Sequence, residues 1–160
     1  MNIGAQFYTV REFCTNLDDF AETLKKIADI GYKNVQISGV CEYSPEWLNE
    51  QLKKNGLKCV ATHIAANRLI GEPQKVAKEH SIFGCDYIGL GWHGFDENKA
   101  SVDLNTFFDT YIPVAKAIKE EGKAFMYHNH DREFIKINNK PILQLMAENV
   151  DADLMGFIPD

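Results

Sequence analysis

Apolar residues follow two alternating patterns along the chain, and this alternation predicts its secondary structure. Stretches with apolar residues at helical spacing predict amphipathic helices. Such stretches end at Gly31 and at Gly122, and glycine accepts the left-handed conformation that closes a helix. Ser44 followed by Pro45 marks a helix start, because serine caps the first turn and proline is tolerated there. We expect helices near residues 17–30, 45–55, 72–83, 104–121 and 141–149.

Short, mostly apolar runs lie between these helices and predict buried strands. The expected strands lie near residues 3–8, 33–38, 57–63, 86–91, 124–129 and 154–158. One helix separates each strand from the next, which is typical of a parallel sheet covered by helices. No linker or low-complexity tract interrupts the series, so a single domain over residues 1–160 is expected. An open doubly wound sheet and part of a (β/α)8 barrel both fit. Length alone favours the open sheet, because a whole barrel takes about 250 residues.

Composition and charge narrow the class of protein. With 45% hydrophobic residues the chain can bury a core, and its net charge of -6 disfavours nucleic acid and anionic membranes as partners. The four cysteines stand far apart without a CxxC motif. The first residues show no signal-peptide pattern, and no window approaches the roughly 18 apolar residues of a membrane span. These features predict a cytoplasmic protein with reduced thiols.

Polar and aromatic side chains follow nearly every predicted strand. In both architectures, chemistry gathers at the carboxyl ends of parallel strands. The residues at these ends are Tyr8, Arg11, Ser38, Glu42, His63, Trp92, His93, His128, His130 and Asp160. Neither GxGxxG nor GxxxxGK[ST] occurs at a strand-to-helix turn. A nucleotide-binding open sheet therefore lacks its main sequence support.

Six segments in order resemble pieces of one known family. They are GAQFYTVRE, LKKIADIGYKNVQISG, NGLKCVATH, GCDYIGLG, YHNHDREF and LMGFIPD. Together they resemble the sugar phosphate isomerase/epimerase family, the xylose isomerase-like TIM barrels. The resemblance implies about five and a half to six of the eight βα units of such a barrel, truncated after the sixth strand. The alternative is an open flavodoxin-like domain, which would carry helices on both sheet faces and a ligand at the strand-order switch point.

The resemblance implies a divalent metal at the carboxyl face and proton transfer next to a sugar carbonyl. Family members typically hold the metal with a carboxylate from the fifth strand, an aspartate from the sixth, a histidine from the seventh and a glutamate from the eighth. Asp160 matches the sixth-strand aspartate, and His128 stands near the fifth-strand carboxylate position. The two later positions lie beyond residue 160. Histidine ligands favour manganese, cobalt or zinc over magnesium.

The resemblance also suggests catalytic and substrate-binding residues. Glu133 and His130 are the expected catalytic residues, with Glu133 as acid/base or as a further metal ligand. Arg11, His63 and Trp92 are the expected contacts to the substrate.

Each candidate also has a purely structural interpretation. His63 could cap a strand end, Arg11 could pair with a carboxylate, and His93 could fill a structural place in a glycine-rich loop. Strand alternation points His128 and His130 the same way, so these two should share one role. His80 lies in a predicted helix and is expected at the surface.

The expected function is metal-assisted isomerisation or epimerisation of a sugar or sugar phosphate, with a metal site that is half present in this chain. The alternative is a non-catalytic barrel remnant or a dimeric sugar-binding module. Six barrel strands leave two open edges with unpaired backbone groups, so self-association through these edges is also expected.

Overall fold

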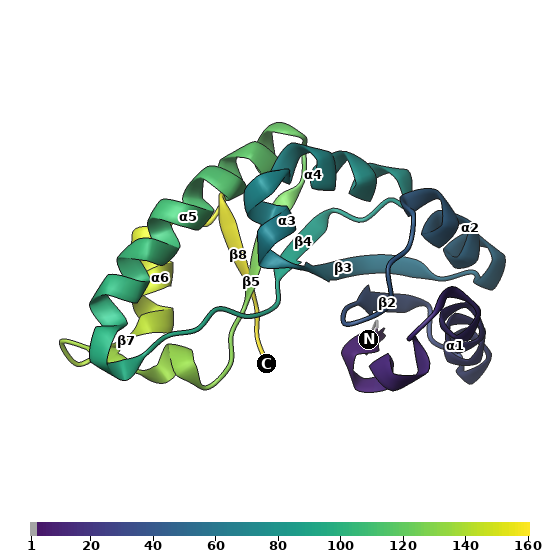
Figure 1. Ribbon diagram of the computed structural model, residues 1–160, viewed down its shortest axis with the longest axis horizontal. Helices are drawn as coiled ribbons and strands as arrows, with labels where there is room; N and C mark the ends of the chain where they lie inside the picture. Colours follow the sequence, from purple (N-terminus) through teal and green to yellow (C-terminus); the bar gives the residue numbers. More distant parts are fainter. Residues whose placement is uncertain (1–2) are drawn as a thin grey trace. The chain divides into compact units, whose positions relative to one another are not determined.

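The computed structural model describes residues 3–160 as a series of parallel strands joined by helices (Figure 1). The strands of the main sheet are β1 (Gly4–Gln6), β2 (Asn34–Ile37), β3 (Lys58–Ile64), β4 (Tyr87–Leu90), β5 (Ala124–His128) and β8 (Met155–Ile158). The connecting helices are α1 (Leu17–Ile30), α2 (Pro45–Asn55), α3 (Ala66–Gly71), α4 (Pro73–Ile82), α5 (Ala100–Glu120) and α6 (Ile142–Asn149). In residues 3–160, no helix is both long and apolar enough to cross a membrane.

The strand order decides between the two architectures. The sheet runs β1-β2-β3-β4-β5-β8, so each strand neighbours the next one along the chain. A doubly wound sheet reverses its order at a switch point, and this order has no reversal. The expectation of βα units from an incomplete barrel is confirmed, and the open flavodoxin-like alternative is wrong.

Local capping explains why the helix limits could be predicted. The expected helices at 17–30 and 45–55 are confirmed at both ends. Gly31 closes α1 with φ 115°, and the Ser44 side chain accepts a hydrogen bond from the Trp47 backbone N–H at 3.2 Å. Asn16 caps α1 by accepting from the Asp19 N–H at 3.0 Å.

Short elements escaped prediction because they lack a periodic pattern. They are α3, the 3-10 helices η1 (Phe7–Phe13), η2 (Glu97–Lys99) and η3 (Arg132–Phe134), and the hairpin strands β6 (Lys136–Ile137) and β7 (Lys140–Pro141). The strand expected at 3–8 is shorter than predicted, because the Gln6 side chain accepts from the Tyr8 N–H and starts η1. Asn138 and Asn139 turn the hairpin with φ of 50° and 66°.

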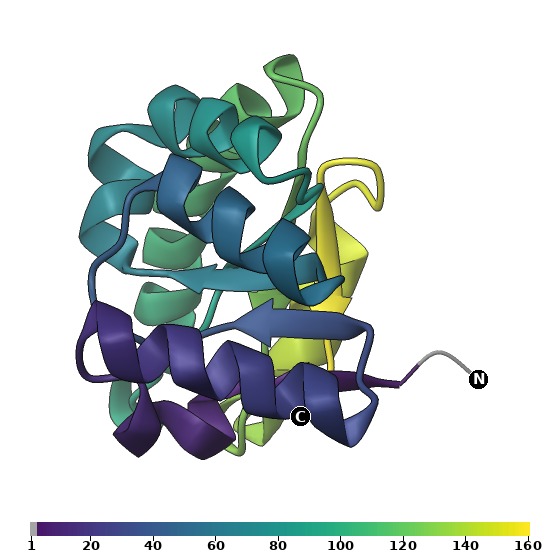
Figure 2. The same cartoon turned by 90° about the vertical axis from the view of Figure 1, so that its right-hand side faces the viewer.

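The chain divides into two compact units, of which the first comprises residues 3–63 and 78–88. Strands β1, β2 and β3 pair in parallel there, with a register shift between Val35 and Gln36. Helices α1 and α2 lie side by side (Figure 2). Their apolar faces join one buried cluster that includes Phe7, Phe20 and Leu48.

His80 belongs to the buried interior of the first unit, so its predicted surface position was wrong. Its side chain is 2% exposed. The ring contacts Phe83, and Nε2 lies 2.8 Å from the Thr62 hydroxyl oxygen. A histidine can be buried at modest cost when a hydrogen-bond partner is buried with it.

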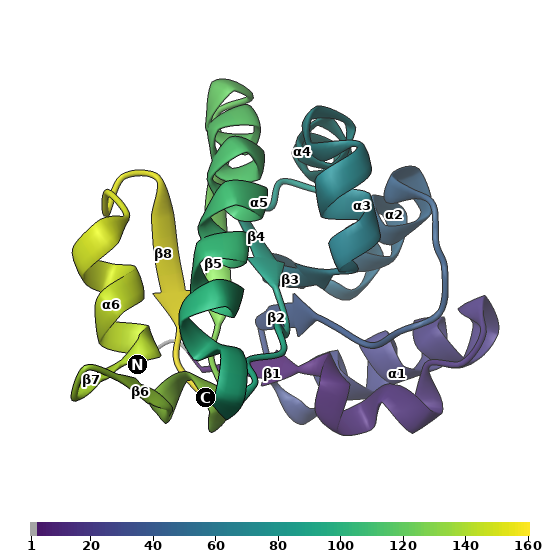
Figure 3. The ribbon, with the colours of Figure 1, turned by 60° about the vertical axis from the view of Figure 1, so that its left-hand side comes forward.

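The second unit comprises residues 64–77 and 89–160. Strand β5 pairs with β8 in parallel, and α5 packs against β5 (Figure 3). Aromatic rings fill the interior between α5 and β5, where Phe107 contacts Tyr127 edge-on and Tyr111 stacks on Phe125. This packing fixes the carboxyl end of β5.

Candidate metal centre

His128 is the last residue of β5 and lies opposite Ile158 of β8. Its Nδ1 lies 2.9 Å from the Ile158 carbonyl oxygen. A carbonyl oxygen can only accept a hydrogen bond, so Nδ1 carries the proton and Nε2 of the neutral ring keeps its lone pair. Histidines that bind metals are commonly held in this way, through the ring nitrogen that does not touch the ion.

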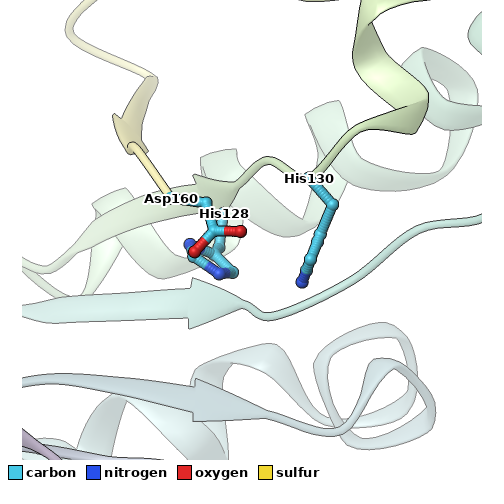
Figure 4. Close-up of side chains that lie close together, drawn as sticks. All are labelled: His128, His130 and Asp160. Atoms are coloured by element: carbon cyan, nitrogen blue, oxygen red, sulfur yellow. The ribbon is translucent and has the colours of Figure 1, made fainter.

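His130 stands two residues further on, beyond the end of the strand. Its ring centroid lies 4.7 Å from that of His128, and the two rings are nearly perpendicular at 78°. Both side chains point the same way, as strand alternation predicted (Figure 4). Within residues 3–160, Nδ1 of His130 is the buried side-chain nitrogen without a hydrogen-bond partner. Buried polar atoms usually have partners, so this one indicates a ligand.

Asp160 brings a carboxylate to the two imidazoles. Figure 4 shows this carboxylate beside the His128 ring. One ligand atom from each of His128, His130 and Asp160 lies within 4.8 Å of the others. Ligand atoms bound to one zinc ion lie at most about 4.4 Å apart, since each bond is about 2.0–2.2 Å. The three side chains would therefore draw slightly closer together to bind one ion.

Glu133 lies in η3 and holds the turn that carries His130. Its side chain is fully buried. One carboxylate oxygen accepts a hydrogen bond from the Tyr127 hydroxyl, and the other accepts from the His130 backbone N–H at 2.7 Å. Glu133 is not among the residues whose ligand atoms converge. Its expected roles as acid/base or metal ligand stay predictions.

Tyr127 was missed by the sequence analysis. It is fully buried, and burial together with the Glu133 carboxylate raises the pKa of its hydroxyl far above the usual value. The hydroxyl therefore stays protonated and remains a donor to Glu133. The sequence signal for Tyr127 was strand alternation. Because Tyr127 directly precedes His128, it is expected to point to the opposite face of β5 from His128.

His63 and Arg11 lie in the first unit, where His63 is half-buried and Arg11 is exposed. His63 has Nε2 at 2.7 Å from the Gln36 side-chain nitrogen and Nδ1 at 3.1 Å from the Ser38 hydroxyl. Gln36 is a polar neighbour that the sequence analysis did not single out. Arg11 donates to the Tyr8 carbonyl at 2.7 Å, and its guanidinium lies 4.3 Å from the centre of the Tyr8 ring. Within residues 3–160, Arg11 forms no ion pair with a carboxylate.

Trp92 and His93 lie in the second unit and differ in exposure. Trp92 is 62% exposed, and its ring lies close over Gly94. His93 contacts Phe95, Phe107 and Tyr111 edge-on. Burial lowers the pKa of His93.

Solved structures of other proteins match nearly the whole of this chain. No family model and no curated protein matches the chain. A solved sugar phosphate isomerase/epimerase from Parabacteroides distasonis matches with a TM-score of 0.78 and 19% identity, covering 99% of this chain and 64% of that one. The fold is part of a xylose isomerase-like TIM barrel. A xylose isomerase-like TIM barrel protein from Mycobacterium smegmatis, solved in complex with magnesium, matches at 0.73 with 11% identity over 99% of this chain and 64% of that one.

A third solved structure is a D-psicose 3-epimerase from Clostridium cellulolyticum with D-tagatose. Its TM-score is 0.66 at 16% identity, covering 100% of this chain and 63% of that one. The chain thus spans 64% of the length of the first of these xylose isomerase-like structures. At these identities the matches show the fold.

Proposed function

We propose that the protein is a metal-dependent isomerase or epimerase of a sugar or sugar phosphate, which moves a proton on the carbon next to the carbonyl. The observation that carries the proposal is the convergence of His128, His130 and Asp160 at the carboxyl ends of β5 and β8. The similarity in fold to an epimerase solved with D-tagatose supports a sugar as the substrate class.

The three residues suit a divalent ion. Two imidazoles and one carboxylate favour manganese, cobalt or zinc, whereas magnesium prefers a set of oxygen ligands. Three protein ligands also leave coordination positions for substrate oxygens. When bound, such an ion would stabilise the negative charge that develops on the sugar oxygens as the proton leaves carbon.

The protein residues around the ligands hold the site in one geometry. The Ile158 carbonyl keeps the His128 proton on Nδ1 and so leaves the lone pair of Nε2 available to an ion. Glu133 holds the backbone of His130, and Tyr127 holds Glu133. In this proposal His130 is the third ligand and Glu133 is a positioning residue. Ligands whose geometry is preset lose less free energy on binding the ion.

The first unit offers groups that suit sugar hydroxyls. The amide of Gln36 in β2, the hydroxyl of Ser38 just after β2 and the imidazole of His63 in β3 form one hydrogen-bonded set. Such groups both donate and accept, as sugar hydroxyls do. Arg11 and the exposed ring of Trp92 are the further proposed contacts, with the ring suited to the apolar face of a sugar.

One observation favours a second candidate, a sugar-binding protein without catalysis. Both oxygens of Glu133 are occupied by internal donors, so its carboxylate is not placed to exchange a proton with substrate. On this alternative a sugar binds and its carbon-bound hydrogens do not exchange.

Manganese titration tests the metal proposal. Isothermal titration calorimetry is carried out on the whole chain and on Asp160→Asn, with Asp153→Asn as the matched control, because Asp153 is also exposed and pairs with Lys119. We expect Asp160→Asn to weaken manganese binding by tenfold or more and Asp153→Asn to leave it unchanged. Absence of manganese binding to the unmodified chain would remove the metal-dependent enzyme from consideration.

Hydrogen exchange separates the enzyme from the binding module. The protein is incubated with a ketose in deuterium oxide with manganese, and proton NMR follows the signal of the hydrogen next to the carbonyl. Loss of that signal supports the enzyme. Sugar binding in a titration without any exchange supports the binding module instead.

A further inference from the structure

The four cysteines of the chain form two pairs within the first unit. Cys59 and Cys85 are fully buried, and their thiols donate to the carbonyls of Ala61 at 3.3 Å and Tyr87 at 3.5 Å. Cys14 is buried and Cys41 is half-buried. The Cys41 backbone N–H donates to the Cys14 carbonyl at 2.8 Å. Only the second pair has a member that solvent can reach.

A main-chain hydrogen bond places Cys14 and Cys41 side by side in the fold. Neither cysteine lies in a strand, so this bond directly joins the end of η1 to the loop after β2. Disulfides span Cα distances of about 4.4–6.8 Å. Both side chains also touch the same apolar cluster, since Cys14 belongs to it and Cys41 packs against it.

We propose that Cys14 and Cys41 are a site of reversible disulfide formation by a peroxide. The partly exposed Cys41 thiolate attacks the peroxide, the O–O bond breaks, and Cys41 becomes a sulfenic acid while water leaves. The Cys14 sulfur then attacks the Cys41 sulfur, the S–O bond breaks, and a second water leaves. Two thiols and one hydrogen peroxide thus yield one disulfide and two waters. A thiol reductant reverses the bridge by exchange.

The bridge would act on the segment that carries Arg11. The Cys14 N–H donates to the Arg11 carbonyl at 3.0 Å. Gly39, two residues before Cys41, lies close to the Tyr8 ring and to the Cβ of Arg11. A covalent link between the two cysteines would therefore join the end of η1 to the loop after β2. It would restrict the movement of the main chain and Cβ of Arg11. Burial raises the pKa of both thiols, so oxidation should be slow at neutral pH.

Peptide mapping tests the proposal directly. The reduced protein is treated with one equivalent of hydrogen peroxide, its remaining thiols are alkylated, and it is digested with trypsin without reduction. A lysine or arginine stands between each cysteine and the next, so every cysteine falls in its own peptide. We expect a linked pair of peptides 12–25 and 34–53, lighter by two hydrogens than their sum, which dithiothreitol separates.

Two variants distinguish the Cys14–Cys41 pair from the Cys59–Cys85 pair. Cys41→Ser should abolish the linked pair and leave Cys14 alkylated, while Cys59→Ala, a change in the other pair, should keep it. The wild-type digest decides alone if a variant does not fold. A bridge between Cys59 and Cys85 alone, a link between two chains, or sulfinic acid on Cys41 without a bridge would overturn the proposal.

Discussion

The ring of His128 and the main-chain carbonyl of Ile158 are joined by a hydrogen bond of 2.9 Å between adjacent strands. The sheet register therefore sets the tautomer of a candidate metal ligand, since the two residues are partners in the β5–β8 pairing. We predict that neutral His128 carries its proton on Nδ1. Long-range nitrogen–proton NMR of the metal-free protein at pH 8 measures this, and a protonated Nε2 would contradict it.

Tyr127→Phe should affect both stability and metal binding. The change leaves one oxygen of the buried Glu133 carboxylate without its donor, which costs about 1–3 kcal/mol of unfolding free energy. Looser support of His130 should weaken manganese binding about tenfold, as changes to groups that support metal ligands do. Urea melts and calorimetry measure the two effects.

Tyr111→Phe is the matched control for this experiment. Tyr111 is also buried in the aromatic interior, where it stacks on Phe125, and burial raises the pKa of its hydroxyl. It should leave manganese affinity unchanged. If both variants weaken metal binding equally, Glu133 does not act through Tyr127.

The stability of the protein should fall in mild acid through His93. Burial lowers the pKa of His93 in the folded chain, with partial opposition from Asp103 and Glu133. The unfolded chain therefore binds a proton first, near a pKa of about 6.5. The contribution of His93 to the unfolding free energy is therefore fully present above that pH. It is lost as the pH falls from there toward the lower pKa of His93 in the folded chain.

A variant isolates this contribution. His93→Phe removes the titrating group while keeping a ring among Phe95, Phe107 and Tyr111. The unfolding free energy from urea melts should drop less between pH 8 and pH 5 in the variant than in the parent. An equal drop in both proteins would show that other groups cause the acid sensitivity.

Alanine substitutions at Gly39 and Gly56 should separate the cost of backbone strain from the cost of a steric clash. Both have left-handed φ, 68° and 61°. A Cβ at Gly39 would lie 2.7 Å from the Tyr8 ring, and a Cβ at Gly56 would meet nothing within 4 Å. Gly56→Ala should cost about 1 kcal/mol from strain alone. Gly39→Ala should cost more, since the Tyr8 ring must move, and thermal melts of the two variants compare them.

The metal site was only partly within reach of prediction. The pairing of His128 with His130 follows from a two-residue spacing, and Asp160 follows from its place after the last strand. That the carboxylate lies with these imidazoles depends on β8 pairing with β5, which brings together residues 30 positions apart in number. The hydrogen-bond partners of Glu133 could not be predicted either, because the burial of Glu133 depends on how η3 folds back on β5.

The sequence by itself determined the order of strands and helices and most of their limits. Glycine and serine caps and apolar spacing act within a few residues, so Gly31 and Ser44 could be interpreted without any tertiary contact. Only the tertiary structure decided which polar groups are buried and with which partner. His80 looked like a surface residue and is buried against Thr62, and Cys14 meets Cys41 although no motif joins them. The physical reason is that these contacts are made between segments distant along the chain, whose approach depends on the packing of the whole unit.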